Sequence, residues 1–280
     1  MNTVAHQAPS AALAAIAQTK ARKDRLDRWR IYAMRLAFFA SLIGLWHALV
    51  WLEVWDEMIF PSLPQVTETL WLGISDQSLP AAIAISLQRL LIGYGLALCI
   101  GIPLGLLLGR VRWLNETFGM LAMGLQALPS ICWLPLAVLW FGLGESAMIF
   151  VVVMGALMAL TLATRDGVKN MPPLYMRAAH VLGASGWRLY VHVMLPATLP
   201  AVLTGAKLGW SFAWRSLMAA ELLLVGVGLG SLLERGRELH DMSLVVAVMM
   251  VIMFVGLMTD RWLFSRLEQR FVHRRWGTSA

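Results

Sequence analysis

Charge is scarce in this chain of 280 residues, since only 14% of the residues are Asp, Glu, Lys or Arg, whereas 59% are hydrophobic. Soluble domains carry about a quarter of their residues as charged side chains, which excludes an ordinary soluble domain. Mean hydropathy is +0.69, and several apolar runs reach the ~20 residues that cross a bilayer as a helix. The composition therefore predicts an all-α, polytopic membrane protein.

Cysteine and catalytic motifs are also nearly absent. The two cysteines, Cys99 and Cys132, lie in apolar runs and show neither a metal-ligand spacing nor a disulfide framework. The sequence has no G-x4-G-K-[ST] and no H-E-x-x-H, and its histidines are scattered. We expect no metal site, no catalytic residue and no enzymatic activity in this chain by itself.

Basic residues gather before the first apolar run, after the last one and in two internal segments. Only five of the 23 lysines and arginines fall elsewhere, namely Arg89, Lys207, Arg215, Arg235 and Arg237. Residues 53–79, in contrast, contain acidic residues and no Lys or Arg. Positive residues accumulate on the cytoplasmic side of membrane proteins, so we expect both termini in the cytoplasm. The pattern leaves no basic stripe with aromatic residues for a nucleic acid.

The apolar runs predict six crossings, at residues 31–52, 80–109, 117–141, 146–163, 200–225 and 242–264. Residues 1–30 are expected to form a cytoplasmic tail that is disordered or lies on the membrane surface. Residues 31–79 would hold the first crossing and a loop on the far side, residues 80–272 the core, and residues 273–280 a second cytoplasmic tail. The glycines of Gly226-x-Gly-x-Gly230 are expected to form a flexible turn on the far side.

Two crossings have unusual patterns. The second has a small residue at every fourth position, which lets helices approach closely in lipid; these residues are Gly93, Ala97, Gly101, Gly105 and Gly109. The third is interrupted by Pro129 and Pro135, with Trp133 between them. Because the freed backbone groups of a broken helix need protein or water, such a helix tends to line a cavity, and Trp133 becomes a candidate for a substrate path.

Residues 171–200 form the longest polar interruption among the apolar runs. Pro172-Pro173 cannot lie inside a helix, residues 174–182 have a helix-forming composition, and Gly183 is placed to end that helix with a positive φ. Pro196 suits the start of the next helix. We expect this segment to dock on a partner in the cytoplasm.

The segment contains Arg177-Ala178-Ala179, then Gly183 after three residues, Val193 after nine more, and Leu195-Pro196 after one more. This resembles the signature E-A-A-x3-G-x9-I-x-L-P of bacterial ABC importer permeases, except that Arg177 replaces the usual Glu and Val193 replaces Ile. Residues 101–105, 133–145 and 214–221 are similar to the nitrate, sulfonate and taurine branch, and the resemblance covers about residues 80–272.

The resemblance implies a type I ABC importer permease fold in a bacterial inner membrane, with residues 80–272 as the permease core and residues 53–79 in the periplasm. It implies a homodimer, two cytoplasmic ATPase subunits that use ATP and Mg, and a periplasmic solute-binding protein. Residues 174–186 would be the coupling helix. The implied ATPase-coupling residues are Arg177, Ala178, Ala179, Gly183, Leu195 and Pro196. The solute would be a small anion such as nitrate, a sulfonate or taurine.

Ionisable residues share one face of the fifth crossing with a serine, a tryptophan and a methionine. At 100° per residue, they fall within about a third of the helix circumference; they are Lys207, Ser211, Trp214, Arg215, Met218 and Glu221. Ionisable groups inside a membrane usually face an interior or a water-filled path, so these residues are candidates for the substrate path. A structural ion pair, either Arg215 with Glu221 or Lys207 with a carboxylate, is the alternative.

Two other functions remain as alternatives. A secondary transporter or channel acting alone predicts inverted repeats, which the sequence does not show convincingly, and it leaves residues 171–200 unexplained. An intramembrane enzyme requires paired catalytic residues inside the crossings, and no such pair is evident.

Overall fold

A computed structural model describes the backbone of residues 8–56 and 59–268, and all regular structure in this described part is helical. The expected tail at residues 273–280 lies outside it, as do Arg270, Arg274 and Arg275. The chain divides into two compact units, residues 1–63 and 64–280.

The first unit is dominated by α1 (Ala8–Trp51), whose part Trp29–Trp51 is long and apolar enough to cross a membrane. The helix begins at Ala8, so of the two alternatives for the tail the disordered one is wrong for residues 8–30, and a helix lying on the membrane surface stays a prediction. After α1, Trp46 Nε1 donates a hydrogen bond to the carbonyl oxygen of Pro61 (3.1 Å), and the rings of Trp46 and Trp55 contact Phe60. These contacts fold the chain back at the end of the first crossing.

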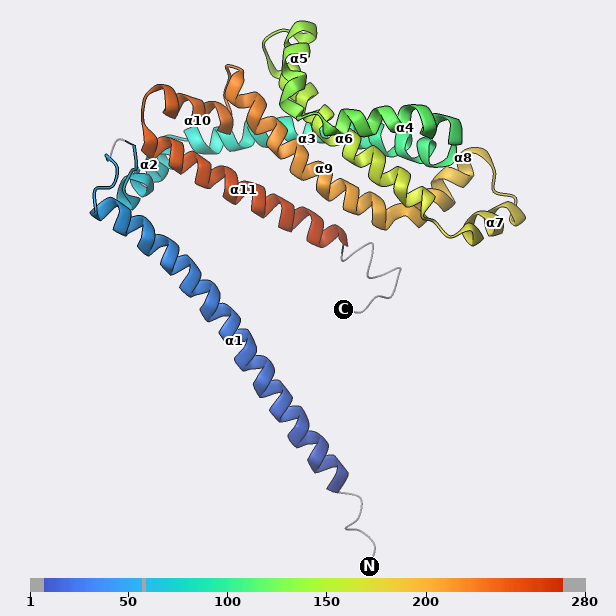
Figure 1. Ribbon diagram of the computed structural model, residues 1–280, viewed down its shortest axis with the longest axis horizontal. Helices are drawn as coiled ribbons and strands as arrows, with labels where there is room; N and C mark the ends of the chain where they lie inside the picture. Colours follow the sequence, from blue (N-terminus) through green and yellow to red (C-terminus); the bar gives the residue numbers. More distant parts are fainter. Residues whose placement is uncertain (1–7, 57–58, 269–280) are drawn as a thin grey trace, which may run out of the picture. The chain divides into compact units, whose positions relative to one another are not determined.

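The remaining helices follow in order in Figure 1: α2 (Leu63–Ser75), α3 (Ser78–Arg110), α4 (Arg112–Ala127), the 3-10 turn η1 (Ser130–Trp133), α5 (Leu134–Phe141), α6 (Glu145–Lys169), α7 (Pro173–Val181), α8 (Gly186–Leu189), the π-helical turn η2 (Tyr190–Met194), α9 (Leu195–Leu223), α10 (Leu229–Glu238) and α11 (Met242–Glu268). In the second unit, α7 and α8 lie at one end and α10 at the other (Figure 1). We call these the α7 end and the α10 end.

Six crossings agree with the structure when the broken third crossing is included. Five spans are long and apolar enough: Trp29–Trp51, Ser78–Arg110, Glu145–Lys169, Gly186–Leu223 and Met242–Trp262. The pair Arg112–Ala127 and Ser130–Phe141 meets the same test but bends by 105° at the break. Leu128 is extended, as expected before a proline, and Pro129 has no N–H to continue the helix.

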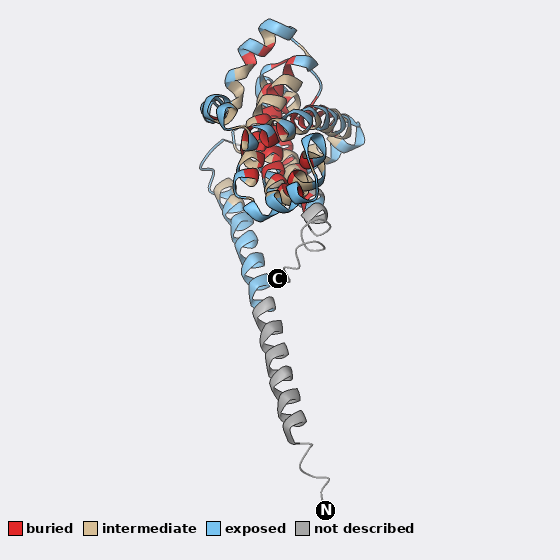
Figure 2. Ribbon diagram, turned by 90° about the vertical axis from the view of Figure 1, so that its right-hand side faces the viewer, coloured by how far each residue is buried: buried red, intermediate tan, exposed pale blue. Residues whose placement is uncertain are grey.

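Helices α3, α6 and α9 form the core of the second unit, and Figure 2 shows buried residues gathered at the centre of its helices. The small-residue stripe predicted for the second crossing faces α6. A Cβ added at Gly105 would lie 2.5 Å from the Thr161 carbonyl oxygen, and one at Gly109 would lie 2.5 Å from Val168 Cβ. Helices this close gain van der Waals contact along their length, which is a main attractive term inside a bilayer.

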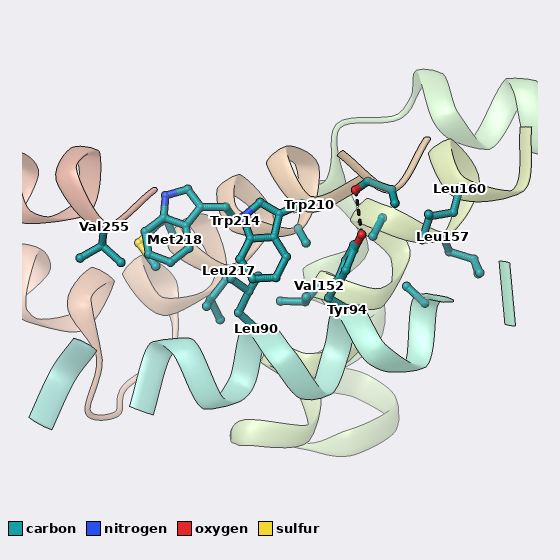
Figure 3. Packing of buried hydrophobic residues seen from close by; sticks show 14 of the residues in the cluster. Leu90, Tyr94, Val152, Leu157, Leu160, Trp210, Trp214, Leu217, Met218 and Val255 are labelled. Atoms are coloured by element: carbon teal, nitrogen blue, oxygen red, sulfur yellow. Dashed lines mark hydrogen bonds between the residues drawn. The ribbon is translucent and has the colours of Figure 1, made fainter. Parts of the chain in front are cut away.

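Aromatic side chains fill the space where α3 meets α9. The Tyr94 hydroxyl donates a hydrogen bond to the Ala206 carbonyl oxygen (2.8 Å), and its ring meets that of Trp210 edge to face at 5.1 Å (Figure 3). Trp214 and Met218 continue this packing toward Val255 of α11 (Figure 3). One face of α9 is thus occupied by core contacts, which limits how much of its circumference can line a path.

Candidate functional site

A buried carboxylate organises the α10 end. The Glu221 side chain, on the last turns of α9, is 0% exposed. Its oxygens accept hydrogen bonds from Ser86 Oγ (2.8 and 2.9 Å), Arg89 Nη1 (3.0 Å) and the backbone N–H of Gly230 (3.0 Å). Burying a carboxylate is costly unless hydrogen-bond donors and an opposite charge replace water, and here both are present.

The glycines between α9 and α10 make room for this carboxylate. A Cβ at Gly228 would lie 2.5 Å from Glu221 Oε1, and one at Gly230 would lie 2.6 Å from Glu221 Cβ. Ser86 Oγ also accepts from the backbone N–H of Leu229 (2.9 Å). The expectation of a flexible turn is therefore wrong: Gly228 and Gly230 are needed for close approach, and the turn is fixed by hydrogen bonds to two helices.

Arg89 of α3 joins this turn to a third element. Its Nη1 donates to Glu221 and to the Val227 carbonyl oxygen (2.6 Å), and its Nη2 donates to Glu145 Oε1 (2.8 Å) at the start of α6. The Arg89 side chain is 6% exposed, whereas that of Glu145 is 69% exposed. Sequence reasoning did not assign Arg89 a role, although an arginine inside an apolar crossing is costly and was a usable signal.

The structure separates the six residues predicted to share one face of the fifth crossing. Because Glu221 pairs with Arg89, the alternative of an Arg215–Glu221 ion pair is wrong. Glu221 is also enclosed, so within this chain it does not line a path as predicted. The four that lie together, on one wall of a hollow of about 640 Å³ between α9 and α11, are Ser211, Trp214, Arg215 and Met218.

Arg215 is exposed and also borders a second hollow, of about 370 Å³, at the break between α4 and η1. Gln126, Pro129 and Ser130 line this second hollow. The Arg215 Nε donates to the carbonyl oxygen of Ser211 (3.1 Å), and the guanidinium lies 4.9 Å from the centre of the Phe212 ring. No carboxylate of the described residues pairs with it, so its positive charge is available at the broken crossing.

Two further path candidates lie elsewhere. Lys207 is exposed, lies three residues before Trp210 of the larger hollow, and lines neither hollow. Trp133 packs edge to face on Phe150 of α6, with ring centres 6.4 Å apart, and lines neither hollow. The predicted cavity at the broken crossing is present, but Ser130 borders it instead of Trp133.

The predicted glycine exit of the polar segment is confirmed at the α7 end. Gly183 has φ of 75°, and nothing lies within 4 Å of the place that a Cβ would occupy there. Its N–H bonds the His180 carbonyl oxygen (3.0 Å), and the N–H of Ala184 bonds that of Ala179 (2.9 Å). This pair of bonds is the Schellman helix ending, which requires a left-handed residue at Gly183.

The helix α7 (Pro173–Val181) is shorter than the coupling helix at residues 174–186 that the resemblance implied. Its underside packs on the body of the protein: Ala179, Leu189 and Met194 form a buried cluster with Leu106 of α3 and Val168 of α6. Arg177 and Ala178 are exposed, Ala179 is buried, and Leu195-Pro196 begin α9 as predicted. Of the predicted docking residues on α7, Arg177 and Ala178 thus face outward and Ala179 faces the body of the protein.

The model of the family described as "Binding-protein-dependent transport system inner membrane component" matches residues 101–273, which is more than half of the chain. The chain belongs to this family. The match begins inside α3 and ends after α11, so it includes the broken crossing, the α7 segment and the turn at Glu221.

Individual relatives agree with the family. A protein of Methanocaldococcus jannaschii named as an ABC transporter permease is 38% identical over 192 residues, covering 68% of this chain and 72% of its own. The taurine transport system permease of Escherichia coli K12 is 29% identical over 241 residues (83% and 88%). The nitrate import permease of Leptolyngbya laminosa is 32% identical over 238 residues (80% and 82%).

Family membership decides between the functions left open by the sequence. The chain is a permease subunit of an ABC transporter, a multi-pass protein of the inner membrane that works with ATPase and binding-protein subunits. A secondary transporter or channel acting alone is the weaker interpretation.

Proposed function

We propose that two copies of this permease form a translocation path for a small anion that a periplasmic binding protein delivers. Two cytoplasmic ATPase subunits, which hold ATP and Mg, dock on residues 171–200 and drive import, while this chain hydrolyses no ATP. The observation that carries the proposal is the Arg215 guanidinium beside the broken crossing, which makes no ion pair with the described residues.

A fixed cation at this place suits an anion. Moving a small anion from water into a membrane protein is costly unless charge or hydrogen-bond donors replace its hydration. Arg215 offers a planar, two-pronged donor that matches an oxyanion, and the Gln126 and Ser130 side chains border the same hollow. Arg215 makes no ion pair with a carboxylate of the described residues, in contrast to Arg89, and Asp260 of α11 borders the larger hollow with it.

The names of the relatives support the same class of solute. Taurine and nitrate, named for the two permeases above, both present oxyanion groups. A sulfonate, nitrate or similar oxyanion is therefore the solute class that we propose here. Lys207 would provide a second positive charge nearer the α7 end of the same helix.

Transport by an Arg215→Ala variant tests the proposal. We expect ATP-driven uptake of the anion into proteoliposomes to fall at least tenfold, with complex yield near that of the wild type. Arg215→Lys should remain impaired because lysine cannot make two parallel hydrogen bonds to an oxyanion. Lys207→Ala should reduce uptake less.

The experiment measures uptake and complex yield on the same preparations, with nitrate, taurine and an alkanesulfonate offered through the cognate binding protein. Normal uptake by Arg215→Ala would refute the anion path. If Arg215→Ala and Lys207→Ala both fail to assemble into the complex, Arg215 and Lys207 have a structural role instead.

Orientation can be tested independently. We propose that both termini are cytoplasmic, so the α10 end faces the periplasm and the α7 end faces the ATPase. Reporter fusions at Asp76, Glu145 and Asp241 should read periplasmic, whereas fusions at Arg112 and Lys169 should read cytoplasmic. A fusion at Arg275, outside the described residues, should also read cytoplasmic. A cytoplasmic signal at Asp241 would contradict this orientation.

A further inference from the structure

The outward face of α7 is an apolar stripe with one arginine along its edge, between Leu174 and Val181 along the helix axis. Leu174, Arg177, Ala178 and Val181 follow the spacing i, i+3, i+4, i+7 and so share one side of the helix. Leu174 is 73% exposed and Val181 is 87% exposed, while Arg177 and Ala178 are also exposed. The opposite side carries the buried Ala179, so this stripe points away from the permease.

No acidic residue stands near Arg177 in the sequence. Between Asp166 and Glu221 the chain contains no Asp or Glu, and the buried Glu221 lies at the opposite end of α9 (Figure 1). In the part of the chain that the structure describes, the Arg177 side chain makes no hydrogen bond or ion pair. Its charge is therefore satisfied only by water in the single chain.

Docking of this stripe on a partner would remove water from the Arg177 side chain. When Leu174 and Val181 enter a partner's groove, Arg177 lies between them and loses its water. A desolvated guanidinium is strongly unfavourable without a hydrogen-bonded anion, and a carboxylate matches its two-pronged geometry. The partner must then supply the negative charge, because this segment has none.

We propose that the groove receiving α7 belongs to the ABC ATPase subunit and carries a carboxylate opposite Arg177, which selects the cognate ATPase. This inference rests on the proposed docking of the ATPase on residues 171–200 and adds the chemistry of the contact. An ATPase with a basic side chain at that place would be rejected, because two desolvated cations repel each other.

Affinity measurements with the purified cognate ATPase test the contact. The permease is reconstituted in nanodiscs of neutral lipid, and the dissociation constant is measured for the wild type, Arg177→Met, Arg177→Lys and Leu174→Ala. Truncating one partner of a buried, hydrogen-bonded charge pair costs at least about 2 kcal/mol, so Arg177→Met should weaken binding at least ~30-fold. The dissociation constant of Arg177→Lys should lie between those of Arg177→Met and the wild type.

Arg188→Met is the matched control. Arg188 is exposed on α8 in the same segment and lies outside the apolar stripe. The substitution removes the same charge, so a general electrostatic attraction would be weakened equally by both changes. We expect Arg188→Met to change the dissociation constant less than about fivefold.

A charge exchange identifies the partner residue. Arg177→Asp should abolish uptake, and selection for restored growth on the transported solute should yield ATPase variants in which one Asp or Glu has become Lys or Arg. Equal binding by Arg177→Met and the wild type would overturn the inference, as would suppressors that never change an acidic residue.

The outcomes separate this inference from the proposed function. If the wild-type permease and all its variants fail to bind the ATPase, the docking itself is wrong. If Leu174→Ala weakens binding but Arg177→Met does not, the ATPase docks on α7 without a carboxylate. If Arg177→Met affects only binding to nanodiscs or vesicles of anionic lipid, Arg177 meets lipid head groups and the inference fails.

Discussion

Arg89 at the α10 end and Arg177 at the α7 end are the same residue type in opposite situations. Arg89 is enclosed by α3, α6 and the turn after α9, and it pairs with Glu221 and Glu145. Arg177 is exposed on α7 with no partner among the described residues. The charge at one end of the permease is buried and paired, whereas the charge at the other end is exposed and has no partner among the described residues.

The difference predicts different failures. Removing one of the two buried charges at the α10 end, Arg89 or Glu221, should affect folding of the permease, because the partner that remains has almost no access to water. Substitutions at the α7 end should leave the permease folded and affect only its work with partners. Three predictions test this contrast, from the largest expected effect to the smallest.

Arg89→Met should have the largest effect. It leaves the enclosed Glu221 carboxylate with only neutral donors, and breaking a buried ion pair from one side costs about 3–5 kcal/mol. We expect most of the protein to be lost as aggregate during purification, measured by size-exclusion chromatography in detergent. Adding Glu221→Gln, which keeps an acceptor for Ser86 and Gly230, should recover at least half of the folded fraction.

The control for that experiment is Glu145→Gln. Glu145 is mostly exposed and accepts a hydrogen bond from Arg89 Nη2. Its replacement should therefore lower the free energy of unfolding by less than about 1 kcal/mol. If Arg89→Met were as well folded as Glu145→Gln, the network around Glu221 would not stabilise this end.

Gly183→Val should leave the permease folded but abolish its productive work with the ATPase. A β-branched residue is strongly disfavoured at φ of 75°, while nothing lies within 4 Å of its Cβ, so only the helix ending is disturbed. Melting temperature, ATPase co-purification and uptake are measured together. Gly183→Asn is the matched control, because asparagine tolerates the left-handed region. Normal uptake by Gly183→Val would show that this segment does not couple.

Gly228→Ala should have a moderate effect. Its Cβ would lie 2.5 Å from Glu221 Oε1, and relieving such a contact costs about 1–3 kcal/mol. Gly226→Ala is matched to it, since its nearest atoms would lie at 3.5 and 3.7 Å, and it should melt like the wild type. Equal melting temperatures for the two variants would mean that the turn is as flexible as its sequence suggests.

Local patterns in the sequence were sufficient for much of the fold. Crossings follow from runs of apolar residues, and the Schellman ending follows from one glycine after a short helix, because both depend on neighbours along the chain. The stripe from Gly93 to Gly109 also predicted a close helix contact, which α6 supplies. The motif around Arg177 to Pro196 indicated the family before any contact was known.

Partners that are distant in sequence were decided by the tertiary structure. A helical wheel placed Glu221 beside Arg215 because it treats α9 alone. In the structure, α3 approaches from the other side and brings Arg89, which is 132 residues away in the sequence, to the Glu221 carboxylate. The glycines after Glu221 read as a loose turn because their need for space arises only from the enclosed side chain. Sequence by itself thus determined the spans, the glycine exit and the family. Only packing among α3, α6 and α9 decided which charged side chains form ion pairs inside the protein and which stay exposed.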